Sequence, residues 1–593
     1  PQVAYYTWML IGFYYFWLII SSIRQGIKPA QKILKPLIYC FFGIIIALFM
    51  VSDPYIDIYK FQSESNRGSA SVLDNSGQTS KGTKWNYATQ WSFHPLELIS
   101  FIYPYHYGLQ NHADLKRGSY WGFMPFTQST HYLGILILIF SIFGYFQKRL
   151  NQNVVIFSFI TILILFTGFG SYFSIIYKPF YDYFPFFSKF RVPSMIYLLL
   201  AITIPFLGAK GMDIFFEKIK EKDFQKKIFR VIGLLIFFTI VLLIIGKATF
   251  SFSAINDARY HPSQISKLFL SRTELFEKGL IITLFISISL IAMVWSFLKN
   301  KLNNFSYKIL LFCLFIFDIG IIANEFMDTK PAKNLDRLFK KDEIVEYLQN
   351  DSEYFRIFPV NQLGSNRYSY WNIESIGGYR PIKLRAYQDL MDAGGFNKPQ
   401  VLDMLNVKYI ISNKEIKSTR FSRIVGLNNL YQNNSSLPKA WIVENVINAE
   451  SQRESLMEIL LSGFNPKNTA IINGYSGKYI NSKGSGTVNV ISRDQDKIEI
   501  RTSSKTGGIL VLSEIFYKNG WKALVNGQNS RIYQANHILR AVEIPSGISN
   551  ISFIYDTSEW KNIRIMSRVS IFTVLFLLGY FIWKESQDKI IDK

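Results

Sequence analysis

The sequence predicts a polytopic α-helical membrane protein with a soluble, strand-rich segment near its C-terminus. The chain of 593 residues is 49% hydrophobic. Its apolar residues collect in runs of roughly 17–22, the length at which a helix crosses the hydrocarbon core of a bilayer. One long segment, residues 328–562, lacks such runs and instead contains short stretches of strand-like alternation. These features exclude an ordinary soluble enzyme and predict a membrane bundle carrying a large soluble part.

Nine apolar runs are expected to cross the membrane as helices. They are residues 3–22, 33–51, 132–146, 154–170, 193–209, 229–249, 279–298, 309–326 and 565–583. The polar segment 250–278 has helical spacing of its apolar residues. Two interpretations of it stay open, a helix on the membrane surface or a re-entrant cover over an outer cavity.

The distribution of Lys and Arg predicts the orientation of these spans. Cations concentrate in four short connections that share one side if the spans alternate, namely residues 21–35, 147–153, 210–230 and 299–308. Short cation-rich loops stay in the cytoplasm. The loops 52–131, 171–192 and 250–278 and the segment 328–562 are then expected outside, and the tail 584–593 inside.

We expect four regions along the chain. Residues 1–327 form the membrane bundle with its large outer loop 52–131, and residues 563–593 form the last span and a cytoplasmic tail. Residues 328–485 predict an α+β module, with a helix at 341–349 and strands at 356–360 and 407–411. Residues 486–562 predict a β-sandwich. Its strands are expected at 487–491, 497–502, 508–516, 522–525, 531–533, 540–544 and 550–555, with a hairpin turn at Asn526-Gly527.

Charge, cysteines and motifs narrow the classes of function. The net charge of +23 lies mainly in loops between spans and on the soluble segment, without a nucleic-acid-binding motif, so no nucleic-acid partner is expected. The two cysteines, Cys40 and Cys313, lie inside apolar runs, so disulfides are not expected. No phosphate-binding P-loop, nucleophile elbow or His-Glu-x-x-His motif occurs.

The outer loop 52–131 is too long and too rich in aromatic and ionisable residues for a simple connector. A second outer loop ends in Arg191, directly before a predicted span. We expect these two loops to lie opposite each other and to share a lipid-accessible site on the outer face of the membrane.

Several short motifs resemble the bacterial YfhO-type membrane proteins, in the same order along nearly the whole chain. Each is weak alone, but the ordered set is specific. They are Pro1-Gln-Val-Ala-Tyr-Tyr6, His94-Pro-Leu-Glu97, Ser119-Tyr-Trp-Gly122, Tyr132-Leu-Gly134, Pro185-Phe-Phe-Ser-Lys-Phe-Arg-Val-Pro193, Ile376-Gly-Gly-Tyr379, Leu405-Asn-Val-Lys-Tyr409, Leu437-Pro-Lys-Ala440 and Tyr517-Lys-Asn-Gly-Trp-Lys522.

The resemblance implies an architecture like that of GT-C glycosyltransferases in the bacterial cytoplasmic (inner) membrane. It implies transfer of a sugar from a polyprenyl-phosphate carrier to a cell-envelope polymer outside. Such enzymes place their catalytic carboxylate in the first outer loop. The chain opens with Pro1 at the start of a span, so we expect that carboxylate upstream of this sequence and expect this chain alone to be inactive. No cofactor is identified, and a divalent cation is compatible with the implied chemistry.

Sugar transfer from a lipid phosphate needs cations for the leaving group, aromatic faces for the sugar and a base for the acceptor. For each candidate side chain a purely structural role stays open: it could anchor the protein at the membrane interface, or it could be an ordinary solvent-exposed polar residue. The candidates for binding are Arg191, Lys189, Arg117, Tyr120, Trp121 and Asp318, and the accessory acid, base or metal-ligand candidates are Glu97 and Asp114. Asp318 lies within a span, so it is expected either to line a cavity or to link two helices by hydrogen bonds. Four histidines, His94, His106, His112 and His131, match no zinc-ligand spacing.

Two other functions stay open on the sequence. The chain could bind or move an envelope lipid or polymer without catalysis, or its soluble segment could recruit an envelope partner. In that segment, Trp521 and Tyr517 are candidates for carbohydrate contact, with core packing as the alternative.

Overall fold

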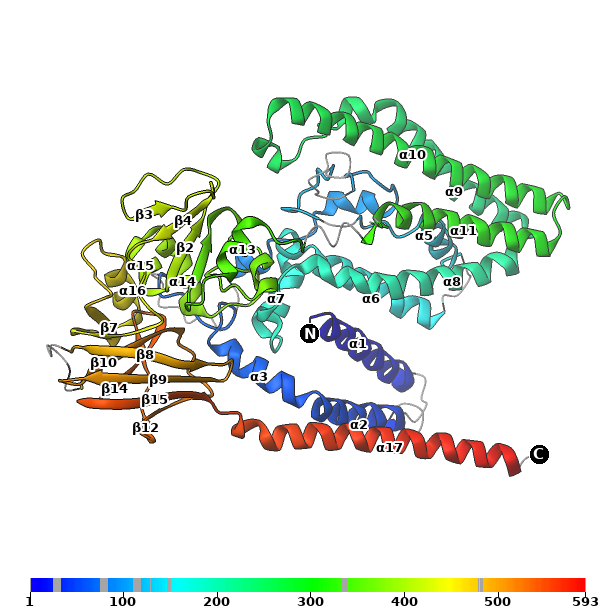
Figure 1. Cartoon of the computed structure of the whole chain (residues 1–593). Coiled ribbons are helices and arrows are strands. Elements are labelled where there is room, and N and C mark those ends of the chain that lie inside the picture. The colour runs from blue at the N-terminus through cyan, green and yellow to red at the C-terminus, as the bar shows by residue number, and fades with distance from the viewer. Residues whose placement is uncertain are drawn as a thin grey trace. The chain divides into compact units, whose positions relative to one another are not determined.

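The computed structural model describes residues 2–24, 34–74, 84–109, 119–127, 130–146, 151–327, 329, 331–332, 339–477, 479 and 484–591. The chain divides into two compact units. Unit 1 comprises residues 1–40 and 83–330, and unit 2 comprises residues 41–82 and 331–593. Each unit is described by itself, and Figure 1 gives the labels of the elements.

Unit 1 is helical. Its longer helices are α1 (Gln2–Arg24), α5 (Ile135–Phe143), α6 (Gln152–Gly168), α7 (Ser174–Tyr183), α8 (Leu200–Lys218), α9 (Lys222–Thr249), α10 (Pro262–Leu298) and α11 (Asn304–Phe326). Helix α5 packs along α8, and α9 packs along α10 (Figure 1). Short 3-10 helices join these elements, including η2 (Pro95–Phe101), η3 (Gly170–Phe173), η4 (Phe187–Lys189), η5 (Pro193–Leu199) and η6 (Ile255–Arg259).

Six helices among the described residues are long and apolar enough to cross a membrane, or up to eight if each of two bent helix pairs forms one span. The six are Gln2–Arg24, Pro193–Lys218, Lys222–Thr249, Pro262–Leu298, Asn304–Phe326 and Ser558–Gln587. The bent pairs are Lys35–Met50 with Ser52–Ser63, at 73°, and Gln152–Gly168 with Gly170–Tyr183, at 116°. The predicted multi-pass membrane architecture is therefore confirmed, while the count of nine spans stays a prediction.

The predicted span 132–146 corresponds to the nine-residue helix α5. At 1.5 Å per residue it is about 14 Å long, less than half the hydrocarbon thickness. Gly134, with φ +89°, precedes its first turn, and Gly144 follows its last. Helix α5 approaches α8 closely, because a Cβ at Gly211 would lie 1.6 Å from the carbonyl oxygen of Phe140. Hydropathy identified an apolar segment here, but that segment packs inside the bundle as a short helix.

Helix α10 begins at Pro262, not near residue 279 where the predicted span starts. His261 caps it by accepting the Ser263 backbone N–H through Nδ1, and the His261 backbone N–H donates to Oε1 of Gln264 at 3.1 Å. Pro262 occupies the first helical position, where its missing N–H costs nothing. The 37 residues of α10 make a helix about 55 Å long. Its first turns are polar, so the predicted span marks only the apolar part of one continuous helix.

The outer loop predicted at residues 52–131 is divided between the two units. Residues 52–74, including α3 (Ser52–Ser63), belong to unit 2, whereas residues 84–131 belong to unit 1. Within unit 2, the Asn66 backbone N–H donates to the Lys383 carbonyl at 2.9 Å, and the Arg385 N–H donates to the Glu64 carbonyl at 2.8 Å. Residues 52–74 therefore form a strap on unit 2.

Unit 2 contains three sheets. A four-stranded sheet has the order β1-β2-β4-β3, a six-stranded sheet the order β5-β10-β14-β13-β7-β6, and a five-stranded sheet the order β12-β11-β15-β9-β8. The strands are β1 (Arg356–Pro359), β2 (Val407–Ile411), β3 (Phe421–Arg423), β4 (Leu430–Asn433), β5 (Ala440–Val443), β6 (Asn445–Ala449), β7 (Thr469–Asn473), β8 (Gly486–Arg493), β9 (Lys497–Ser504), β10 (Gly508–Ile515), β11 (Trp521–Val525), β12 (Gln528–Ser530), β13 (Tyr533–Ala535), β14 (Leu539–Ile544) and β15 (Gly547–Tyr555).

The six- and five-stranded sheets enclose one apolar core. Strand β10 alternates across its sheet, so Leu510 and Leu512 face this core together with Phe553 from β15. Ile509 and Val511, on the opposite face, pack into a second core with the helices α14 (Arg385–Asp392), α15 (Pro399–Met404) and α16 (Gln452–Leu460). The predicted sandwich is therefore present. Its six-stranded sheet also uses strands from both sides of the module boundary predicted at residue 485.

Two local features of unit 2 follow the prediction closely. Asn526 and Gly527 both have positive φ, +51° and +80°, between the paired strands β11 and β12, as a type I′ hairpin turn requires. The terminal helix α17 (Lys561–Ile591) covers the predicted span 565–583. It lies along α2 (Lys35–Met50) and α3, and the Ser567 hydroxyl donates to the Met50 carbonyl at 2.5 Å (Figure 1).

Candidate functional site

The candidate site in unit 1 is built on residues 84–101. The short helix α4 (Trp85–Ala88) leads through a turn into η2. His94 caps η2 by accepting the Leu96 backbone N–H at 3.2 Å, and Pro95 occupies its first position. This arrangement places Tyr87 and Trp91 before the cap, and Glu97 one turn after it.

Arg191 contacts this segment directly. Its guanidinium lies over the rings of Tyr87 and Trp91, 4.1 and 4.8 Å from their centroids, and it donates a hydrogen bond to the Tyr87 hydroxyl. The neighbouring Val192 N–H donates to the Ala88 carbonyl at 3.1 Å. No carboxylate among the described residues forms an ion pair with Arg191. The structure thus brings the two predicted outer loops together, and it places no carboxylate of the described residues in an ion pair with this cation.

Lys189 lies two residues before Arg191, in η4. It is partly buried, and this burial lowers the pKa of its ammonium group. Phe186 and Val192, on either side of the pair, both have φ of +63°, which side chains other than glycine rarely adopt. The turn that presents Lys189 and Arg191 therefore has an uncommon backbone conformation, immediately before the long apolar helix that starts at Pro193.

Glu97 is a buried carboxyl group with only 2% of its surface exposed. The Tyr120 hydroxyl donates to it at 3.0–3.1 Å, and the Phe123 backbone N–H donates at 2.8 Å. Burial raises the pKa of Glu97 to about 7 against the opposing effect of these hydrogen bonds. A carboxyl group with this pKa exchanges its proton near neutral pH, as a general acid or base must.

Tyr120 and Trp121 are buried, and they pack inside unit 1. Tyr120 bonds to Glu97, whereas Trp121 contacts the rings of Tyr107 and Phe252 at 4.6 and 5.1 Å. Their predicted contact with a sugar or phosphate is not tested. In this arrangement Tyr120 positions Glu97, and Trp121 fills the surrounding aromatic core.

A buried ion pair that the sequence analysis missed holds this region. Arg272 of α10, 2% exposed, binds both carboxylate oxygens of Asp257 at 2.7 and 2.8 Å. It also donates to the backbone carbonyls of Ser119 and Phe252 at 3.2 and 2.8 Å. An arginine between apolar residues in the first turns of a long helix was the available signal. Arg272 fixes the backbone just before Tyr120.

Asp318 of α11 is fully buried. It accepts hydrogen bonds from the Tyr132 hydroxyl and from the Leu136 backbone N–H, the latter at 2.9 Å. These contacts link α11 to the beginning of α5, which is the second of the two interpretations given above. A role in substrate binding is not tested.

The remaining predicted site residues give no further cluster. Asp114, Arg117 and His112 lie outside the described residues. His94 stacks on Phe123 with ring centroids 3.7 Å apart, and His106 is enclosed by aromatic rings. Among the residues that the structure describes, no three His, Cys, Asp or Glu side chains form a group able to hold a metal ion.

The comparisons with known proteins identify one segment of the chain. Residues 477–567 match the model of the family described as bacterial membrane protein YfhO. Over these residues the chain is similar to the YfhO family. The search of curated proteins and the search of solved structures each returned no match.

The YfhO segment covers the five-stranded sheet and the first residues of α17. It also contains the predicted carbohydrate contacts Trp521 and Tyr517. Trp521 is partly buried with the Arg540 guanidinium 3.8 Å from its ring centroid, and both aromatic residues line a hollow of about 490 Å³ with Lys518 and Arg531. Trp521 therefore packs against the core between the two sheets and also lines this hollow.

Proposed function

We propose that this membrane protein takes part in sugar transfer from a polyprenyl-phosphate carrier to a cell-envelope polymer, on the outer face of the bacterial cytoplasmic membrane. The observation that carries the proposal is the environment of the Arg191 guanidinium. Its guanidinium is held against two aromatic rings, has no carboxylate ion pair among the described residues, and precedes an apolar helix long enough to cross a membrane. A guanidinium binds phosphate oxygens in a fixed fork, so this position suits the phosphate of a membrane-embedded lipid.

Glu97 supports the same proposal. It is on the segment that contacts Arg191, and its pKa of about 7 suits a group that takes or gives a proton. We propose it as an accessory acid or base and not as the principal catalytic carboxylate. The bilayer, the lipid-linked sugar and the acceptor polymer are the proposed partners.

The proposal is tested with the full-length protein in membranes supplied with polyprenyl-phosphate-linked hexoses. Arg191→Ala is expected to reduce transfer by at least about 100-fold, because a charged hydrogen-bonding group to the leaving phosphate is worth about 2.7–4 kcal/mol. Arg191→Lys should retain part of the rate, since it keeps the charge but loses the fork. Lys267→Ala, at an exposed cation of α10, is the matched control and should transfer at the wild-type rate.

The same experiment separates the alternatives. Unchanged transfer by Arg191→Ala would remove Arg191 from the site. Absence of transfer in the wild type, with polyprenyl phosphate still bound tightly and released by Arg191→Ala, would favour a protein that binds or moves the lipid without catalysis. Absence of both transfer and lipid binding would overturn the proposal.

A further inference from the structure

A second hollow is lined only by residues of unit 2, whereas Arg191 belongs to unit 1. It has a volume of about 420 Å³, within the usual size range of small-molecule sites. Its wall combines three kinds of element: the strap helix α3, the segment between β1 and α14, and the strands β1 and β10. Elements distant in the sequence therefore form one binding-sized cavity.

The charged side chains that line this cavity are all cations, namely Arg356, Arg380 and Lys383. Arg380 is exposed and Lys383 is partly buried. Neither forms an ion pair with a carboxylate in the part of the chain that the structure describes. The cavity therefore presents two cations that no described carboxylate pairs with, and its positive potential favours an anionic ligand.

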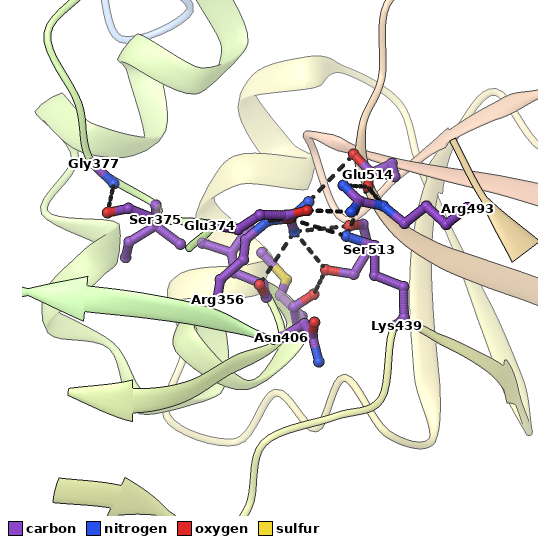
Figure 2. A network of polar contacts seen from close by, with 12 residues as sticks. Arg356, Glu374, Ser375, Gly377, Asn406, Lys439, Arg493, Ser513 and Glu514 are labelled. Carbon is purple, nitrogen blue, oxygen red and sulfur yellow. Dashed lines mark hydrogen bonds and ion pairs between the residues drawn. The ribbon is translucent and has the colours of Figure 1, made fainter. Parts of the chain in front are cut away.

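The third cation, Arg356, belongs to a fixed network behind the cavity. Its Nε lies 3.2 Å from Glu374, its Nη2 lies 3.3 Å from Glu514, and its Nη1 donates to the Ser513 carbonyl at 2.8 Å. Figure 2 shows Arg356 of β1, Ser513 and Glu514 of β10 and Glu374 close together.

Two further cations complete this network. Lys439 and Arg493 bind Glu514 at 2.7 and 3.1 Å. Burial alone would raise the pKa of Glu514, but Arg356, Lys439 and Arg493 lower it to about 2. The wall formed by Arg356 is therefore rigid and keeps its charge.

The next part of the wall requires glycine. Gly378 has φ of +125°, and its N–H donates to the Leu363 carbonyl at 2.7 Å. A Cβ at Gly377 would lie 2.3 Å from that same carbonyl oxygen, which is too close for any side chain. The Gly-Gly pair brings this backbone against Leu363 and holds Tyr379 and Arg380 at the rim.

The rest of the lining is apolar. Phe61 reaches the cavity from the strap, and Ile376, Met391 and Leu405 line it from the other elements. The Tyr387 hydroxyl donates to the Ile376 carbonyl at 2.5 Å, which fixes the ring in the wall. A ligand that fits must combine an anionic group with carbon–hydrogen faces.

We propose that this cavity of unit 2 binds an acidic saccharide, with the carboxylate or phosphate contacted by Arg380 and Lys383 and the ring packed on the apolar wall. A saccharide ring offers both hydroxyl groups and carbon–hydrogen faces, which Ser369, Asn366 and Phe61 can contact. The proposal concerns binding only and does not depend on the transfer reaction or on Arg191.

The test measures binding of three probes to the full-length protein in detergent by saturation-transfer NMR titration. Glucose, glucuronate and glucose 6-phosphate share one ring and differ in their anionic group. We expect glucuronate or glucose 6-phosphate to bind at least tenfold more tightly than glucose, and the two distinguish a carboxylate from a phosphate ligand. Arg380→Gln and Lys383→Gln should each lower the affinity for the preferred acidic probe by about tenfold. This is the effect of losing one charged hydrogen bond.

The controls keep the test decisive. Arg501→Gln removes an exposed cation of β9 that does not line the cavity, and it should leave all three affinities unchanged. Thermal unfolding of each variant checks that the fold is retained. Equal affinity for the three sugars, no binding of either acidic probe, or an equal loss in Arg501→Gln would overturn the proposal.

Discussion

Glu97 is the residue whose environment makes the sharpest prediction about pH. Its folded-state pKa is about 7, whereas an unfolded glutamate titrates near about 4.3. Between these values the folded chain holds a proton that the unfolded chain releases. The free energy of unfolding therefore falls as pH rises through this window, by up to about 4 kcal/mol for this group.

Glu97→Gln is expected to remove this dependence, because the amide accepts hydrogen bonds without ionising. We compare the melting temperature of the variant with that of the wild type at each pH. The variant minus wild-type difference should be more positive at pH 8 than at pH 5. Thermal unfolding of the detergent-purified protein at the two values measures the difference. Glu217→Gln, at an exposed position of α8, is the control, and a Glu97→Gln difference that does not change with pH would contradict the raised pKa.

The sequence predicted some site residues and missed others for a physical reason. Glu97 and Arg191 stood out because each lies beside a feature readable in one segment, a capped turn or the start of an apolar run. Their partners Tyr120 and Tyr87 come from 23 and 104 residues away. Such long-range contacts depend on packing, which local pattern does not specify.

At the scale of the element, helix α10 holds η6 and the backbone at Ser119 in place through one side chain. Its polar first turns carry Arg272, which binds Asp257 of η6 and the backbone carbonyl of Ser119. Hydropathy placed the start of this helix 17 residues late. A hydropathy window measures how apolar a segment is, and it does not detect the polar first turns of a helix. The His261-Pro262 cap and Gln264 were the sequence signals for the true start.

Arg272→Met is expected to lower the free energy of unfolding by about 3–5 kcal/mol, because it leaves the buried Asp257 carboxylate without its partner. Asp257→Asn combined with Arg272→Met should recover part of this loss. The measurement is thermal unfolding of the single and double variants in detergent. Lys267→Met on the same helix is the control, and a double variant whose loss equals the sum of the single losses would argue against a coupled pair.

In unit 2 the positions of several strands were predictable from the sequence, but the order of the strands in the sheets was not. Strands β8, β9, β10, β14 and β15 lie where alternation predicted them, because alternation reflects which residues of one segment face the core. Strand order is not local. The antiparallel pairings of β10 with β5 and of β13 with β7 join segments on both sides of residue 485, so no boundary read from one segment could place them.

At the scale of the whole molecule, the chain is a multi-pass membrane protein whose β-rich C-terminal unit contains the segment that matches the YfhO family model. Its orientation rests on the cations between spans. The predicted connection 210–230 contains Lys218, Lys220 and Lys222 among its cations, which predicts a cytoplasmic position. Unit 2 should then lie outside, together with the cavity proposed for an acidic saccharide.

This orientation predicts which positions a membrane-impermeant thiol reagent reaches in intact cells. In a background with Cys40→Ala and Cys313→Ala, Lys417→Cys on the exposed surface of unit 2 should be labelled without permeabilisation. Lys220→Cys, exposed between α8 and α9, should be labelled only after the membrane is opened. Both cysteines replace exposed lysines, so a difference in labelling reports the side of the membrane and not burial. The reverse pattern would place unit 2 in the cytoplasm, where an acceptor polymer of the envelope could not reach it, and would end the case for transfer at the outer face.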